Sequence, residues 1–392
     1  MDKKQVPRSI LSIAISTIMV LGNYLPYLGS IDVLAATDGM IAEKTENGYH
    51  LKNDYFDVET GKYGEITSLK IVGDEFDTNY VMNVKDNPKQ DTGAHEWLGD
   101  LMFKTKKDGE DSWSESLTNS SDAGRTVELK DNKIIVTYDN SKAEGTRAIK
   151  DFKLVETYSL VDDQLKWDIT VENTNDSDLV FGDFGVPLAF HEIWVNQGEA
   201  YEACTVDHSF VGKDSSYVYA TRPSGQGHFL LMTPETETGA GFEYQDHWQV
   251  GQRRAEEKEW CMDQADWANG LNVFYIHSDA ISKDAKSGNK GYMESSSMTL
   301  KAGESKTYSF NFTGVADESE MKTELYDEGI IDAVAVPGMT FAKDMPAKMY
   351  LHTKVDAKDI SFEYRCPHTN NLHQGTNTVS NNLACERTDE NT

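Results

Sequence analysis

A strict alternation of apolar and polar side chains over residues 164–173 constrains the fold of this 392-residue chain more than any other feature. In this segment, QLKWDITVEN, the side chains of Leu165, Trp167 and Ile169 fall on one side and polar side chains on the other. A period of two is the pattern of a β-strand with one buried face. The preceding segment alternates in the same way, and only a short acidic turn separates the two. The pair is therefore predicted to form an antiparallel hairpin.

The same alternation recurs at 133–138 and 306–312, with turn-forming residues between the strand-like runs. No regular alternation of strands with long helices is present, which excludes a doubly wound parallel sheet. We therefore predict an all-β protein, built as a large two-sheet antiparallel supersandwich. A short helix at 317–332 and an incomplete second β-domain are expected to follow it. Acidic residues in the first turn of that helix suit its dipole, and Gly329 suits its C-terminal cap.

The composition along the chain predicts six parts. These are a signal peptide at 1–35, a linker at 36–47, the supersandwich at 48–315, a helical linker at 316–335, the incomplete small β-sandwich domain at 336–365 and a tail at 366–392. The tail is rich in Asn and Thr and lacks apolar alternation. It is either disordered or translated out of frame, and the abrupt change after Arg365 favours a truncated product.

The N-terminus has the features of a secretory signal peptide. Three basic residues precede the apolar run at 10–22, and small residues follow, which predicts cleavage after Ala35 and a secreted protein. The apolar run is shorter than the roughly 20 residues that a membrane-spanning helix needs. No membrane association is expected after cleavage.

The net charge of −29 repels phosphate backbones, so nucleic-acid binding is excluded. None of the four cysteines has the spacing of zinc ligands, and no metal or cofactor is expected. Export permits a disulfide between Cys204 and Cys261, with two buried free thiols as the alternative.

The segment 241–254, GFEYQDHWQVGQRR, is the main candidate binding site. It gathers aromatic, acidic and basic side chains in an otherwise acidic chain, and such a mixture suits a sugar, with aromatic faces against C–H groups and polar groups on hydroxyls. The candidate ligand-binding residues here are Tyr244, Asp246, His247, Trp248 and Arg253. The alternative is a loop packed on a neighbouring domain, with its arginines forming ion pairs with nearby carboxylates.

The segment 189–196 is a second, weaker candidate. His191 beside Glu192 could transfer protons, and Trp194 could contact a glycan. The catalytic candidates are His191, Glu192 and Asp246, although the pattern at 189–196 also fits an ordinary strand. The stretch just before it, Gly-Asp-Phe-Gly at 182–185, predicts a bulge or a close backbone approach, and with the following proline it is interpreted as a sheet corner.

The stretch YSLVDDQLKWDITVENTNDSDLVFGDFGVPLAF, together with SMTLKAGESKTYSFNFTGV at 297–315, resembles the large N-terminal β-supersandwich of bacterial glycoside hydrolases and phosphorylases. The segment at 53–83 with EWLGDLMF more specifically resembles a family of secreted bacterial proteins known only as a domain of unknown function. The resemblance covers roughly residues 48–364. It implies a galactose-mutarotase-like double sheet that precedes a helical barrel, and the barrel usually carries the catalytic carboxylates.

The resemblance leads us to expect a secreted, non-catalytic domain of a polysaccharide-degrading enzyme. Such a domain would bind a glycan or oligosaccharide, or support a helical catalytic domain of the same parent protein. A stand-alone sugar-active enzyme, either a glycosidase or an aldose epimerase, and a structural spacer are the alternatives.

Overall fold

The computed structural model of the chain describes residues 39–81, 98–118, 123–190, 204–247, 272–284, 294–336, 348–355, 360–365 and 372–377. The predicted signal peptide lies outside these ranges. Among the helices in these ranges, none has both the length and the apolar character needed to cross a membrane.

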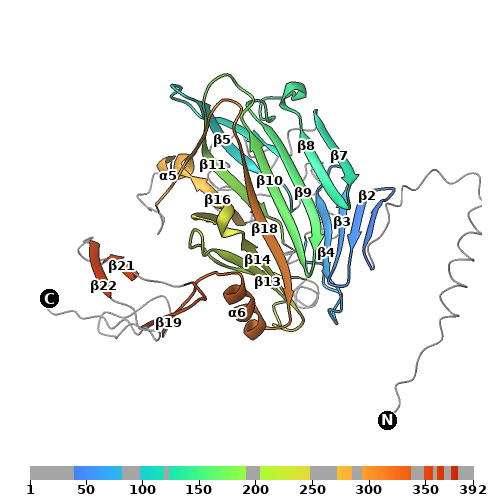
Figure 1. Cartoon of the computed structure of the whole chain (residues 1–392), viewed down its shortest axis with the longest axis vertical. Helices are drawn as coiled ribbons and strands as arrows, with labels where there is room; N and C mark the ends of the chain where they lie inside the picture. The colour runs from blue at the N-terminus through green and yellow to red at the C-terminus, as the bar shows by residue number, and fades with distance from the viewer. Residues whose placement is uncertain are drawn as a thin grey trace, which may run out of the picture.

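Within the described ranges, antiparallel strands form one large sheet of eight strands (Figure 1). In spatial order they are β12 (Val206–Phe210), β13 (Tyr217–Thr221), β14 (Phe229–Pro234), β18 (Ser305–Val315), β10 (Gln164–Glu172), β9 (Lys153–Val161), β8 (Lys133–Tyr138) and β7 (Arg125–Lys130).

A second sheet, with six strands in the described part of the chain, packs against the first. Its strands are β15 (Tyr244–His247), β16 (Asn272–Ser278), β11 (Leu179–Leu188), β5 (Met102–Lys107) and β6 (Ser114–Leu117), with β17 (Met298–Leu300) paired to β11. A four-stranded sheet lies beside the large one and consists of β1 (Ile41–Lys44), β2 (Gly48–Lys52), β3 (Phe56–Gly61) and β4 (Ile66–Ile71). The predicted all-β, two-sheet antiparallel fold is confirmed.

The predicted hairpin is formed by β9 and β10. Leu165 pairs with Leu160 and Trp167 with Tyr158, in the antiparallel register that the short turn imposes. The apolar side of β10 is fully buried, with Leu165, Trp167 and Ile169 each 0% exposed. Strand β18 pairs with β10 on the side opposite β9. Its apolar residues alternate in the same way, and Phe310 and Phe312 are buried in the same layer of the core.

One continuous apolar core fills the space between the two large sheets and extends under the four-stranded sheet. Phe184 on β11 meets Tyr308 on β18 across this space, edge to face, with ring centroids 5.3 Å apart. The core thus joins the two sheets through aromatic rings, and truncating one of these rings to Ala would cost about 3–5 kcal/mol.

The interpretation of Gly-Asp-Phe-Gly at 182–185, with Pro187, as a sheet corner is wrong. Strand β11 is an inner strand, paired with β5 on one side and β16 on the other. The predicted irregularity is nevertheless present, because the register shifts at Gly182 and again between Phe184 and Gly185. At Gly182 an added Cβ would lie 2.4 Å from the Trp113 ring, so the close approach is confirmed too. Among the described strands, Pro187 pairs with β16, whereas the pairing of β11 with β5 ends at Gly185. The missing N–H of Pro187 therefore removes no hydrogen bond between β11 and β5.

The predicted helix is α6 (Glu318–Asp327). Asp317 caps it, because its Oδ1 accepts hydrogen bonds from the backbone N–H groups of Ser319 and Glu320. Gly329 follows the helix with φ +78°, as expected of a residue in the C-terminal cap. Met321 and Leu325 pack on the outer face of the large sheet.

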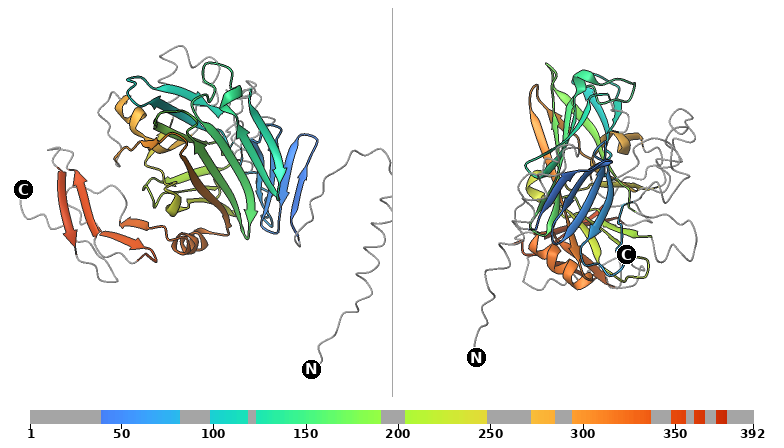
Figure 2. Two further views of the ribbon diagram at one scale, coloured as in Figure 1. Left: turned by 45° about the horizontal axis from the view of Figure 1, so that its top comes forward. Right: turned by 90° about the vertical axis from the view of Figure 1, so that its right-hand side faces the viewer.

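Two expectations about the ends of the supersandwich need correction. Strand β1 lies inside the segment expected to be a linker at 36–47, and it pairs with β2. After α6, β19 (Asp332–Val336) pairs with β20 (Lys348–His352). Then β21 (Ile360–Arg365) pairs with β22 (Leu372–Asn377), which lies in the tail for which no strand was expected. Figure 2 shows these hairpins beyond α6, outside the main sandwich.

Candidate functional site

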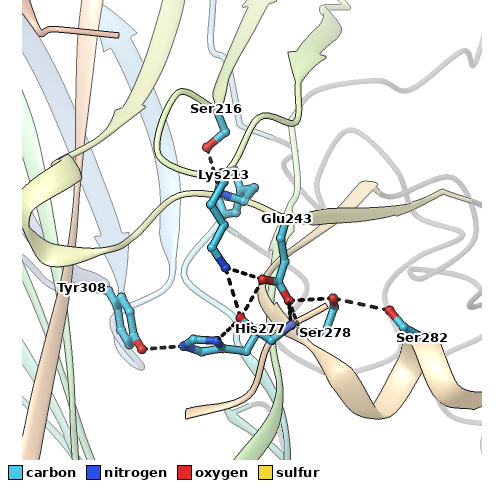
Figure 3. A network of polar contacts seen from close by, with 9 residues as sticks. Lys213, Ser216, Glu243, His277, Ser278, Ser282 and Tyr308 are labelled. Atoms are coloured by element: carbon cyan, nitrogen blue, oxygen red, sulfur yellow. Dashed lines mark hydrogen bonds and ion pairs between the residues drawn. The ribbon is translucent and has the colours of Figure 1, made fainter. Parts of the chain in front are cut away.

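The candidate site is a buried polar network around Glu243, the residue just before β15 (Figure 3). The Glu243 side chain is 0% exposed and forms an ion pair with Lys213. Its Oε1 accepts hydrogen bonds from the backbone N–H (2.8 Å) and hydroxyl (2.7 Å) of Ser278, and from the backbone N–H of Ser296 (2.7 Å). Its Oε2 accepts a hydrogen bond of 2.6 Å from the Ser296 hydroxyl. A buried carboxylate is tolerated only when paired and hydrogen-bonded in this way.

A strained turn holds the lysine in place. Lys213 has φ +58°, a left-handed conformation that is uncommon outside glycine. Its backbone pairs with Phe242, whose N–H donates to the hydroxyl of buried Ser216. Gly241 passes so close that an added Cβ would lie 1.9 Å from the Lys213 carbonyl oxygen. Strain kept by several independent contacts is typical of functional sites.

A β-bulge aims His277 into the network. On β16, His277 pairs with Phe184 and Tyr275 pairs with Gly185, so Ile276 between them has no partner on β11. Without the bulge, strand alternation would put His277 on the same outer face as Tyr275. The extra residue reverses the alternation and turns His277 towards the space between the sheets.

Hydrogen bonds extend the network from Glu243 to the core. His277 Nδ1 lies 2.9 Å from the Ser296 Oγ, and His277 Nε2 lies 2.7 Å from the Tyr308 Oη. Because the Ser296 hydroxyl donates to the Glu243 carboxylate, it must accept from His277 Nδ1–H. The Tyr308 hydroxyl must then donate to Nε2. Burial lowers the pKa of His277 to about 4, so this imidazole is neutral at pH 7.

This arrangement suits an internal anchor better than a catalytic dyad. Tyr308 is only 2% exposed, and burial together with the charge of Glu243 raises the pKa of its hydroxyl. Neither property suits a group that must touch and deprotonate a substrate. The network instead joins five separate segments of the chain, at positions 213, 243, 277–278, 296 and 308, and it thereby fixes the edge of the six-stranded sheet.

On the outer face of this sheet, Tyr244 is half-buried and packs against the Tyr275 ring, with centroids 5.8 Å apart. Nearby, Lys104 Nζ lies 3.7 Å from Asp183 Oδ2. Asp183 also accepts a hydrogen bond of 2.8 Å from the backbone N–H of Ile281 in α5 (Asp279–Asp284). Asp183 therefore accepts a hydrogen bond from a backbone N–H, as an aspartate in a Gly-bounded bend is expected to do.

The structure places only part of the candidate site predicted from sequence. Tyr244, Asp246 and His247 all lie on β15, but the side chains of Asp246 and His247 are outside the described part. Five further candidates also lie outside it, namely His191, Glu192, Trp194, Trp248 and Arg253. Cys204 is buried, and Cys261 is outside the described residues, so the choice between a disulfide and two buried free thiols is untested.

Sequence reasoning missed the anchoring residues. Glu243 lies inside the predicted segment 241–254, yet its partners come from positions 213, 278 and 296. The available signal in the sequence was Glu243 between the aromatic residues Phe242 and Tyr244. A carboxylate buried beside them would need polar partners from elsewhere in the chain.

The fold and this network define a two-sheet β-supersandwich with an anchored edge strand. The chain belongs to a family of unknown function, DUF5695, whose model matches residues 64–382. The match includes residues 366–382 of the segment expected to be a tail. No match is found among curated proteins.

A solved structure shares the fold. The protein named Polysaccharide Lyase BACCELL_00875 superposes with a TM-score of 0.56 at 15% identity, over 84% of this chain and 43% of that protein. This chain therefore spans less than half the length of that protein. A galactose mutarotase related enzyme from Lactobacillus acidophilus gives a TM-score of 0.39 at 11% identity, over 69% of this chain and 98% of the other. A galactose mutarotase-like protein from Lactobacillus casei ATCC 334 gives 0.39 at 13% identity, over 70% and 100%.

Proposed function

We propose that this chain is a secreted, carbohydrate-binding supersandwich that serves as the non-catalytic part of a polysaccharide-degrading enzyme. The observation that supports this most directly is the anchored strand β15. Glu243 fixes the start of the strand, and Tyr244, the first of the predicted sugar-contacting residues, follows immediately. Sugar binding benefits from aromatic and polar groups that are held in place before the ligand arrives, because less entropy is then lost on binding.

Two further points favour a carbohydrate. The acidic chain, with a net charge of −29, suits neutral glycans rather than polyanions. The protein of similar fold carries the name of a polysaccharide lyase, which supports a carbohydrate-related role for this chain as well. The non-catalytic assignment rests on the burial of Tyr308, which keeps the perturbed acid–base pair away from any ligand.

Isothermal titration of the full chain against a panel of neutral oligosaccharides tests the proposal. Trp248→Ala and Tyr244→Ala are expected to weaken binding by about tenfold or more, because each removes an aromatic contact. Tyr55→Ala is the matched control, since Tyr55 is 52% exposed and lies in the four-stranded sheet region. Equal binding by all three variants would remove β15 from the proposal, and no heat with any sugar would remove glycan binding.

A stand-alone sugar-active enzyme is the second candidate, favoured by the adjacent His191 and Glu192 in the sequence, which could transfer protons. It predicts turnover of a glycan by the purified chain, lost in His191→Ala or Asp246→Asn. Unchanged activity in both variants would reject these residues. A spacer role predicts instead tight association with a helical catalytic domain and no sugar binding. Secretion with cleavage after Ala35 is checked by the N-terminal sequence of the exported protein.

A further inference from the structure

The outer face of the eight-stranded sheet carries a compact polar patch, on a different sheet from β15. The side chains of β10 and β18 alternate, so those that do not enter the core point outward. We define the sheet-face patch by its five polar residues, which are Lys166, Asp168, Glu235, Ser309 and Asn311.

Cross-strand pairing brings these residues together. Lys166 on β10 is opposite Asn311 on β18, and Asp168 is opposite Ser309. Asn311 is also opposite Thr233 on β14, so the patch covers three adjacent strands, seen side by side in Figure 1.

An ion-pair network fixes the charged members of the patch. Lys166 Nζ lies 2.6 Å from Glu235 Oε1 and 3.7 Å from Asp168 Oδ1. The Ser309 hydroxyl donates to Asp168 Oδ1 at 2.6 Å. The three charged side chains are between 26% and 31% exposed, so they are held in position and still meet solvent. Acceptors and donors are thus preorganised on one surface.

Asn311 provides the amide group of the patch. The residue is 5% exposed, and its amide atoms are not among the fully buried polar atoms of the described residues that lack a hydrogen-bond partner. The amide therefore keeps contact with solvent at the surface of the patch. Because Phe310 and Phe312 on either side enter the core, the Asn311 amide points outward into the patch. It offers a donor and an acceptor at the centre of the surface.

Neighbouring elements frame the patch. On one side, Gln164 donates hydrogen bonds to Glu324 of α6 at 3.3 Å and to Glu328, the C-cap of α6, at 2.8 Å. On the other, Thr238 of the short helix η4 (Thr236–Thr238) accepts a hydrogen bond from the Ser309 backbone N–H. The surface is therefore bounded by structure on both sides of the row from Lys166 to Asn311.

We propose that the sheet-face patch is a second binding site, for a neutral oligosaccharide. Sugar hydroxyls both donate and accept hydrogen bonds, so they match an amide, an ammonium group and two carboxylates. One cation and two anions leave a net charge of −1 on the patch, in a chain of net charge −29, which disfavours uronate-containing glycans. In the described residues, no group of three acidic, His or Cys side chains is arranged to hold a metal ion, which favours the sugar over a cation.

The test uses the full chain and calorimetric titration with cellohexaose, mannohexaose and galactohexaose, and with oligogalacturonate as the anionic probe. The Trp248→Ala background is expected to weaken binding at the β15 site by about tenfold or more, so the patch contributes a larger share of the binding that remains. In that background, Asn311→Thr is expected to weaken binding of a neutral probe by about fivefold or more, since one amide contributes about two hydrogen bonds. Threonine suits a strand, and Thr233 and Thr313 already occupy this face, so the variant should fold.

Thr307→Ala, on the same strand and face, is the matched control and should leave affinity unchanged. If the Trp248→Ala chain binds no sugar, the second site is overturned while the β15 proposal stands. If Asn311→Thr leaves the residual binding intact, the assignment of Asn311 is overturned. Preference for oligogalacturonate would overturn the neutral ligand class. Saturable Ca²⁺ binding that Asn311→Thr abolishes would replace the sugar with a cation.

Discussion

His277 on β16 and Tyr308 on β18 belong to opposite sheets, and a hydrogen bond of 2.7 Å between Nε2 and Oη joins them. This bond is the polar counterpart of the aromatic contact between Phe184 and Tyr308. It also connects the core of the sandwich to Glu243, through Ser296. The edge strand of the six-stranded sheet is thus tied to the large sheet through a chain of named hydrogen bonds.

Tyr308→Phe removes the hydroxyl that donates to His277 and keeps the ring in place. We expect the free energy of unfolding to fall by about 1–2 kcal/mol, because the buried Nε2 acceptor loses its partner. Chemical denaturation with a fluorescence readout measures the change. Tyr55→Phe is the control, since this tyrosine is 52% exposed. A loss in Tyr308→Phe no larger than in Tyr55→Phe would mean that the hydrogen bond does not stabilise the fold.

The pH dependence of stability should depend on Glu156, which is 1% exposed on β9. Burial raises its pKa to about 7, although the hydroxyls of Tyr138 and Tyr158 and the Trp167 indole N–H all donate to the carboxyl group. A raised pKa means that the folded state binds this proton more tightly than the unfolded state. The contribution is therefore complete below about pH 4.5 and is lost as the pH rises through about 7.

We expect the free energy of unfolding to decrease between pH 5 and pH 8, and Glu156→Gln to flatten that slope, because glutamine cannot ionise. Urea denaturation at several pH values, in wild type and variant, measures it. Glu128→Gln on β7 is the control, since Glu128 is exposed and its loss should leave the slope unchanged. A Glu156→Gln slope that matches wild type would show that other groups set the pH dependence.

Sequence patterns over neighbouring residues predicted the strands well. They did not predict the contacts between distant segments that form the site. Leu165, Trp167 and Ile169 were placed correctly because period-two alternation depends only on neighbouring residues. The direction of the His277 side chain could not be predicted, because the bulge at Ile276 depends on how β16 pairs with β11. His277 pairs there with Phe184, which is more than 90 positions earlier in the sequence. Pro187 suggested an edge, but a strand can keep a proline where only one neighbour pairs with it.

The binding segment shows the same division. Tyr244 was predicted to contact a ligand from composition, and the structure puts it on an edge strand, beside Tyr275. Glu243, one position earlier, was not singled out. Its partners Lys213 and Ser296 are distant in sequence, and only the folded chain brings them together. The helix after the sandwich was predictable, because its cap residue Asp317 and its terminal Gly329 act locally.

Asp317→Ala is expected to destabilise α6 by about 1 kcal/mol, because two backbone N–H groups at the start of the helix lose their acceptor. The loss should be visible as faster amide hydrogen exchange over Ser319 and Glu320 before it affects the sandwich. Asp317→Asn is the control, since asparagine caps helices about as well as aspartate. Equal exchange in the alanine variant and in wild type would show that packing of Met321 and Leu325, rather than the cap, holds the helix.

Gly241→Ala tests whether the anchor fixes β15. An added Cβ would lie 1.9 Å from the Lys213 carbonyl oxygen, a backbone atom that cannot rotate away, so the Lys213–Phe242 pairing should break. We expect a loss of stability of about 2 kcal/mol or more, from strain and from a buried carboxylate that loses its lysine. Gly303→Ala is the control for introducing a side chain at a turn, because Gly303 has φ +75° and no atom within 4 Å of the added Cβ. That control should lose only about 1 kcal/mol. If the two variants have equal unfolding midpoints in urea, the close approach of Gly241 to Lys213 does not hold the edge strand, and Glu243 alone must position Tyr244.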